Sequence, residues 1–115
     1  MAASAKPGLV CWASMPIQGT HNRKSRPVVV VSSQPFTNRT GFVHLLPIAT
    51  TLGSRLESLV PRLVAGRGKL DPKSRLILDI LITENANVLG EKIGDLEEAQ
   101  LRQAIAAFSA TLAST

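Results

Sequence analysis

Four consecutive valines, Val28 to Val31, constrain the fold of this chain more than any other segment. β-Branched residues in a row disfavour a helix and favour an extended strand. Because no polar residue interrupts the run, we expect the strand to be covered on both faces. Pro27 has no backbone donor and suits the first residue of a strand, and it holds Arg26 in an extended backbone. The sequence therefore predicts a cation fixed at the start of a rigid strand, the support that a phosphate-cleaving site requires.

The length and composition predict one small domain without a cofactor. A chain of 115 residues is long enough for one modest core, so we expect a single domain over residues 1–115. It has three Phe, one Trp and no Tyr, which argues against a platform for stacked bases. The single cysteine, Cys11, excludes an intramolecular disulfide and reads as a buried thiol. No Cys/His set has metal-ligand spacing, so neither a metal nor another cofactor is expected.

The charge is unevenly distributed along the chain. The net charge is +5, with eleven cations and two acids up to Arg75, and two cations and six acids after it. A basic body with an acidic end suggests a polyanionic partner, either nucleic acid or an acidic peptide. The alternative is a solvated surface without a partner. The N-terminus lacks an apolar signal region and no segment is long enough to span a membrane, so we expect a cytoplasmic location and no membrane partner.

Short apolar runs separated by turn residues predict a mainly β, mostly antiparallel barrel. A long loop is expected at residues 16–25, a polar connection with one helical turn at 34–41, and a loop-rich stretch at 52–73. The expected strands, of which the fourth is short, lie at 9–13, 27–32, 41–48, 62–65 and 74–83.

The last predicted strand alternates, so its two faces are assigned separately. The core face carries Leu76, Leu78, Ile80 and Ile82, and the other face carries Arg75, Ile77, Asp79, Leu81 and Thr83. After it, Asp95 and Glu98 have the spacing of a capping box. A helical stripe follows them, so we expect a C-terminal helix packed on the sheet. The stripe consists of Leu101, Ile105, Phe108 and Leu112.

These residues, in this order, resemble the MazF/PemK/Kid toxins of type II toxin–antitoxin systems, within the CcdB/PemK superfamily. The resemblance comprises GLVCW from Gly8, Pro16 with Gly19, RPVVVVS from Arg26, Pro47 with Ile48, SRLILDI from Ser74 and IGDLEEAQL from Ile93. It implies an SH3-like antiparallel β-barrel with a C-terminal helix, acting as a homodimer. It also implies metal-independent cleavage of single-stranded mRNA to a 2′,3′-cyclic phosphate and a 5′-hydroxyl. A cognate antitoxin with an acidic, disordered tail would silence the toxin.

The resemblance places Arg26 at the family's essential arginine, and the guanidinium fork matches phosphate oxygens. The alternative for Arg26 is a surface salt bridge. The family's catalytic threonine aligns with Ala49, which has no hydroxyl. We hypothesise that Thr50 or Thr51 supplies the missing hydroxyl. The alternative is that these residues only form a turn of small residues.

Asp79 matches the family's aspartate near the end of the last strand, although the glutamine that follows it in the family is Ile80 here. Some members carry an arginine where this chain has Ile77. Arg75 lies on the same strand face, so we hypothesise that Arg75 substitutes for that arginine. The alternative is that Arg75 and Asp79 form a structural ion pair.

Further cations and one histidine are candidate RNA contacts. His21 lies where the family often has glutamate and could act as a general base near neutral pH, or it could simply be solvated. The other candidate contacts are Arg23, Lys24, Arg67 and Lys69. The prediction is a toxin-type endoribonuclease. Ala49 favours two rivals: a non-catalytic CcdB-like gyrase poison, and a degenerate nucleic-acid-binding module, whether for RNA or DNA, that no longer cleaves.

Overall fold

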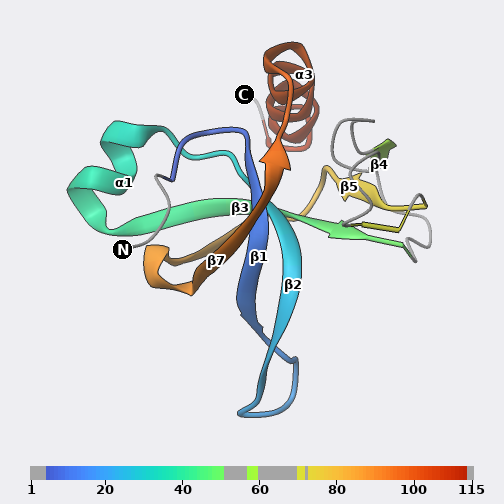
Figure 1. Ribbon diagram of the computed structural model, residues 1–115. Coiled ribbons are helices and arrows are strands. Elements are labelled where there is room, and N and C mark those ends of the chain that lie inside the picture. The colour runs from blue at the N-terminus through green and yellow to red at the C-terminus, as the bar shows by residue number, and fades with distance from the viewer. Residues whose placement is uncertain (1–4, 51–56, 60–69, 72, 114–115) are drawn as a thin grey trace.

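The computed structural model describes residues 5–50, 57–59, 70–71 and 73–113. In these residues one antiparallel sheet has the strand order β4-β5-β3-β2-β1-β7, and β6 pairs with β3. The predicted mainly β antiparallel fold with a C-terminal helix is confirmed (Figure 1). The strands are β1 (Leu9–Pro16), β2 (Arg23–Val30), β3 (Phe42–Ala49), β4 (Glu57–Leu59), β5 (Arg75–Ile77), β6 (Ile82–Asn85) and β7 (Leu89–Asp95). The helices are α1 (Gln34–Thr40), the short 3-10 turn η1 (Ala86–Val88) and α3 (Glu98–Ser109).

The valine run lies in the centre of the sheet, where β2 runs between β1 and β3. Val29 belongs to a core cluster with Val10, Leu46 and Ile93, among others. Val28 and Val30 belong to a second cluster, which includes Cys11 and Leu45. Successive valines therefore alternate between two cores, and the prediction that this strand is covered on both faces is confirmed.

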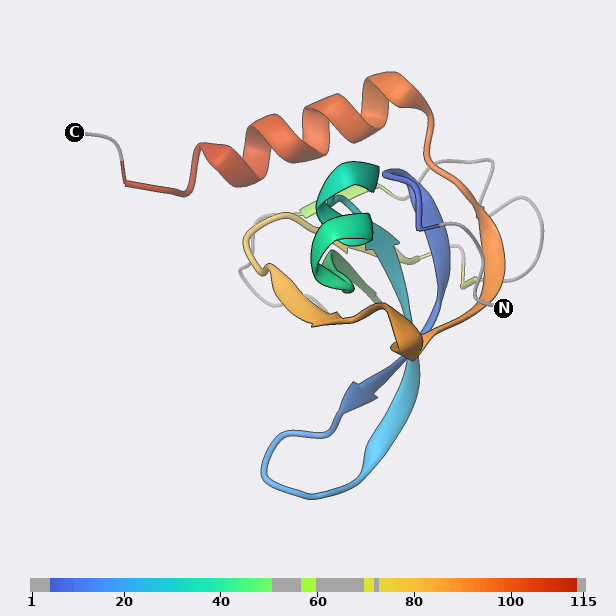
Figure 2. The same ribbon diagram turned by 90° about the vertical axis from the view of Figure 1, so that its left-hand side faces the viewer.

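The start of β2 corrects the prediction that the strand begins at Pro27. The strand begins at Arg23, within the predicted loop, because the β1–β2 hairpin is longer than expected. Pro27 is tolerated inside it because β3 pairs with β2 only from Val28 onward. In Figures 1 and 2 the tip of this hairpin projects away from the body of the molecule, on the side opposite α3.

The predicted strand at 74–83 is wrong as a continuous element. It consists of β5 and β6, which pair with different parts of β3. Ile48 lies opposite Leu76, whereas Leu45 lies opposite Ile82. A step of three residues along β3 is therefore matched by a step of six residues along the segment that contains β5 and β6. The extra three residues leave the ladder and disrupt the alternation. Leu76 and Leu78 are buried as predicted, but Ile77 is buried as well, at 3% exposed.

The helix α1 is longer than the single turn predicted near Pro35. Its first turn is capped by the Ser33 hydroxyl, which accepts a hydrogen bond from the Phe36 backbone N–H at 3.2 Å. It ends at Gly41, whose positive φ of 78° suits glycine. Capping by these two residues explains how a polar segment of seven residues forms a helix.

The C-terminal helix is confirmed, but its predicted capping box is wrong. Its N-cap is Glu97, which makes no side-chain cap hydrogen bond, and Asp95 ends β7 and forms an ion pair with Lys92 at 2.8 Å. Leu101 and Phe108 of the predicted stripe pack against the core around the buried Ala104.

The other two residues of the predicted stripe are exposed, Ile105 at 41% and Leu112 at 58%. Among the described residues, no helix is long and apolar enough to cross a membrane.

Two further strands were not predicted. β4 lies in a stretch expected to be loop-rich, and the strand predicted at 62–65 lies outside the described residues. β7 was missed because Gly90, Glu91, Lys92 and Gly94 interrupt its apolar pattern. Its backbone nevertheless pairs with β1, with shifts of register between the paired residues.

Candidate phosphate-binding site

Three neighbouring strands bring Arg26, Ala49 and Arg75 into one row. Ala49 lies directly opposite Arg75 across β3 and β5. Val28, opposite Pro47, is the last residue of β2 that pairs with β3 at this end, and Arg26, two residues beyond it, lines one pocket with Ala49. Residues opposite one another across a sheet share a face, so Arg75 flanks Ala49 on the same side.

A pocket of about 330 Å³ opens beside this row. The described residues that line it include the cation Arg26 and two hydroxyl residues, Thr50 and Ser74. Thr50 is exposed at the end of β3, whereas Ser74, which precedes β5, is only 5% exposed. A guanidinium and hydroxyls around one hollow are suited to bind a phosphate group. The lining consists of Arg26, Pro27, Ile48, Ala49, Thr50 and Ser74.

Arg26 also borders a second, apolar pocket of about 290 Å³. Arg26 therefore lies between the pocket that contains the hydroxyl residues and this apolar pocket. The second pocket is lined by Met15, Pro16, Arg26, Val28, Pro47, Ile48 and Ile82.

The charge of Arg26 is available to a ligand. Its side chain is exposed, and no carboxylate of the described residues lies within 4 Å of its guanidinium. The alternative of a structural salt bridge is thus not seen among those residues. Lys24, also exposed, lies two residues earlier on the same side of β2 and adds positive charge nearby.

The residues of the last predicted strand are separated by the break between β5 and β6. Arg75 is half-buried in β5, and its Nη1 donates a hydrogen bond to the Ser74 carbonyl at 3.1 Å. Asp79 is half-buried and lies in the segment between β5 and β6. Ile77 is buried, so its position contributes no exposed side chain to the site.

The remaining candidate contacts are dispersed. Arg23 is held on the hairpin: its Nη2 donates to the Ser14 carbonyl at 2.7 Å and to Glu84 Oε1 at 3.0 Å, and its Nε donates to Ser14 Oγ at 3.0 Å. His21 is exposed in the turn between β1 and β2. Thr51, Arg67 and Lys69 lie outside the described residues.

Sequence reasoning did not single out Ser74, although it lines the pocket. The available signal was a hydroxyl residue immediately before Arg75, but its position beside Thr50 depends on how β3 and β5 pair. Ala49 lies opposite Arg75, and the next residues along these two antiparallel segments are Thr50 and Ser74, which both line the pocket.

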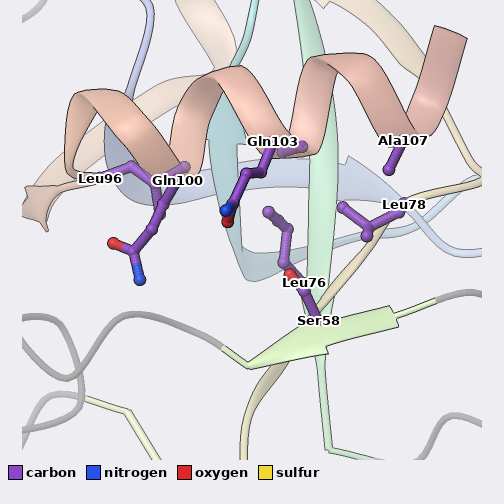
Figure 3. A pocket seen from close by; sticks show the side chains of 8 residues that line it. Ser58, Leu76, Leu78, Leu96, Gln100, Gln103 and Ala107 are labelled. Atoms are coloured by element: carbon purple, nitrogen blue, oxygen red, sulfur yellow. The ribbon is translucent and has the colours of Figure 1, made fainter.

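A third pocket, of about 360 Å³, lies between α3 and the β4–β5 pair (Figure 3). In Figure 3 the side chains of Gln100 and Gln103 extend from α3 toward this space, and Leu76 and Leu78 line it from the sheet side. None of the described residues that line it is charged. These residues therefore supply none of the cations that a phosphate site needs.

Comparison with known proteins identifies the family. Residues 6–112 match the model of the PemK-like, MazF-like toxins of type II toxin–antitoxin systems. Because the match spans most of the chain, this protein belongs to that family. A search of curated protein sequences found no significant match.

Solved structures share the fold at low sequence identity. A MazE–MazF structure (Form-III) from Deinococcus radiodurans has a TM-score of 0.78 and 15% identity, covering 98% of this chain and 100% of that one. An endoribonuclease from a mycobacterial species has a TM-score of 0.67 and 17% identity, covering 96% and 92%. The Mycobacterium tuberculosis toxin MazF-mt6 has a TM-score of 0.60 and 20% identity, covering 87% and 93%. The likeness extends over nearly the whole chain and supports the MazF-like fold.

Proposed function

We propose that this chain is the toxin of a type II toxin–antitoxin system and a metal-independent, sequence-specific mRNA endoribonuclease. The observation that carries the proposal is the row of Arg26, Ala49 and Arg75 beside a hydroxyl-containing pocket. Family membership supports it, as does the description of one similar structure as an endoribonuclease. The fold alone would not assign an activity, so the proposal depends on the site.

The proposed reaction is attack of an RNA 2′-hydroxyl on the adjacent phosphorus. The 2′-oxygen loses its proton and forms the new bond, the bond from phosphorus to the 5′-oxygen breaks, and that oxygen gains a proton. The products are a 2′,3′-cyclic phosphate and a 5′-hydroxyl. In the intermediate, negative charge grows on the non-bridging oxygens, where Arg26 and Arg75 would stabilise it. Thr50, or Thr51, would assist the proton transfer.

The two pockets beside Arg26 suggest how one nucleotide would lie. Its phosphate would occupy the pocket that contains Thr50, and its base the apolar pocket that contains Met15 and Ile82. Lys24, and His21 at the hairpin tip, would contact neighbouring phosphates, which positions RNA without reading its sequence. Arg23 would contribute charge while remaining bound to Glu84.

The partners follow from the same proposal. The toxin would form a homodimer and be neutralised by a cognate antitoxin whose acidic, disordered tail covers the basic site. Similar proteins have been crystallised with an antitoxin: MazF with MazE, and a mycobacterial endoribonuclease with its cognate antitoxin. Action on mRNA would place the protein in the cytoplasm.

The test is an RNA-cleavage assay with the purified chain in EDTA, with analysis of the product ends. We expect cuts at a short sequence that leave a cyclic phosphate and a 5′-hydroxyl. Arg26→Ala should slow them by about 100-fold or more, because it removes a charge that acts in the transition state. Arg39→Ala, which removes an exposed cation on α1, is the matched control and should cleave normally.

A second candidate function is a toxin or binding module without nuclease activity. The observation that favours it is Ala49, which leaves the row without a hydroxyl. RNA that is bound but not cut would support a binding module. Inhibition of gyrase supercoiling with intact RNA would support a poison of that enzyme.

A further inference from the structure

The row of Arg26, Ala49 and Arg75 has a hydroxyl beside it even though Ala49 has none. Of the described residues that line the pocket at this row, two carry a hydroxyl, Thr50 and Ser74. Stabilising a charged transition state favours a donor that is held in place before the reaction begins. The two residues differ in this respect.

The backbone of Ser74 is held by hydrogen bonds on both sides of its Cα atom. Its backbone N–H donates a hydrogen bond to the Asp71 carbonyl at 2.9 Å, and its own carbonyl accepts the Arg75 Nη1 hydrogen bond at 3.1 Å. The residue is 5% exposed, yet it lines the pocket. Thr50, in contrast, is exposed at the strand end, where water competes for its hydroxyl.

We propose that the Ser74 hydroxyl donates a hydrogen bond to a non-bridging oxygen of the scissile phosphate and so replaces the hydroxyl that is missing at Ala49. The proposal rests on the proposed nuclease function and specifies its site. No covalent bond forms to Ser74. Because its carbonyl also holds Arg75, this one residue positions both a neutral donor and a cation at the same phosphate.

The first test compares Ser74→Ala with wild type in single-turnover cleavage at saturating RNA. We expect a rate about 100- to 1,000-fold lower, the size of effect seen when one transition-state donor is removed. Ser32→Ala is the matched control, since Ser32 is another buried serine, 4% exposed, whose hydroxyl bonds the His44 backbone N–H outside the site. A wild-type cleavage rate in Ser74→Ala overturns the proposal.

A second test separates a phosphate contact from a merely structural role. The double variant with Ala49→Thr and Ser74→Ala should cleave at least about tenfold faster than Ser74→Ala alone, because the new threonine places a hydroxyl between the two arginines. An RNA in which sulfur replaces one non-bridging oxygen of the scissile phosphate should slow cleavage by wild type more than it slows cleavage by Ser74→Ala. If Ser74→Ala loses activity with no restoration and an unchanged sulfur effect, Ser74 is structural and the proposal is wrong.

Binding distinguishes failure of this proposal from failure of the nuclease function. The probe is the same RNA with 2′-O-methyl groups, which cannot be cleaved. If wild type cleaves no RNA but Ser74→Ala binds this probe several-fold more weakly, the phosphate contact stands and the nuclease function fails. If wild type cleaves no RNA and both proteins bind the probe equally, both are wrong.

Discussion

Arg26 and Arg75 reach the same row with different constraints on their side chains. Arg26 is exposed and borders two pockets, so a phosphate can approach its fork directly. Arg75 is half-buried and already donates one hydrogen bond to the Ser74 carbonyl. Its guanidinium has five N–H donors, and this hydrogen bond uses one of them. Arg26 would thus bind the phosphate, and Arg75 would hold the geometry of the site.

The resemblance singled out Arg26 as a candidate, because an arginine before proline and a valine run is a local pattern. It left the hydroxyl open between Thr50 and Thr51. Ser74 was missed because its proximity to Thr50 depends on the pairing of β3 with β5, which lie more than twenty residues apart in the sequence. A pairing between distant segments cannot be read from a local pattern.

Cys11 gives a prediction for the dependence of stability on pH. Burial raises the pKa of its thiol from 9.0 to about 11, and a hydrogen bond with the Gly90 backbone opposes this in part. The folded protein therefore keeps a proton that the unfolded chain loses in this range. The corresponding stability is present below pH 9 and falls as the pH rises toward 11, by about 2 kcal/mol.

The measurement is urea unfolding of wild type and Cys11→Ala at intervals between pH 8 and 11. The free energy of unfolding of wild type should fall more steeply with pH than that of the variant. Because the same lysines titrate in both proteins, the difference between the two curves isolates the thiol. Curves that stay parallel over this range would contradict the prediction.

Among the elements, β2 and α3 were predictable, whereas β5 and β6 were not predictable as separate strands. Consecutive valines and a helical apolar stripe are local signals, and both elements are present. The division at 78–81 leaves no such signal, because Leu78, Ile80, Leu81 and Ile82 continue an apolar run through it. Only the fixed register on β3 shows that extra residues must leave the ladder there.

The helix α3 offers a test of how it is held on the sheet. Phe108 packs against the core, and Phe108→Ala should lower the free energy of unfolding by about 2 kcal/mol. Ile105 belongs to the same sequence stripe but is 41% exposed, so Ile105→Ala should cost less than about 1 kcal/mol. Urea unfolding of the two variants measures both values. Equal losses would show that the whole stripe is buried in solution, as the sequence pattern alone suggested.

For the molecule as a whole, the sheet topology gathers the site from distant parts of the chain. β2, β3 and β5 are adjacent in the sheet, where Ala49 lies opposite Arg75 and Arg26 lines a pocket together with Ala49. The basic part of the sequence ends at Arg75, and the more acidic remainder begins with the segment that leads into β6. Among the described residues, β2 and β5 carry Lys24, Arg26 and Arg75, and such positive charge is what binding to a polyanion requires.

The central claim is that Arg26 and Arg75 act on one phosphate, and a double-mutant cycle tests it most directly. Arg26→Gln, Arg75→Gln and the double variant are compared in single-turnover cleavage of the same RNA. We predict that each single change slows cleavage by about 100-fold. The double variant should cleave much faster than the two single effects multiplied together would give, which corresponds to a coupling free energy of at least about 1 kcal/mol. An unchanged rate in Arg75→Gln, or effects that simply multiply, would contradict the claim.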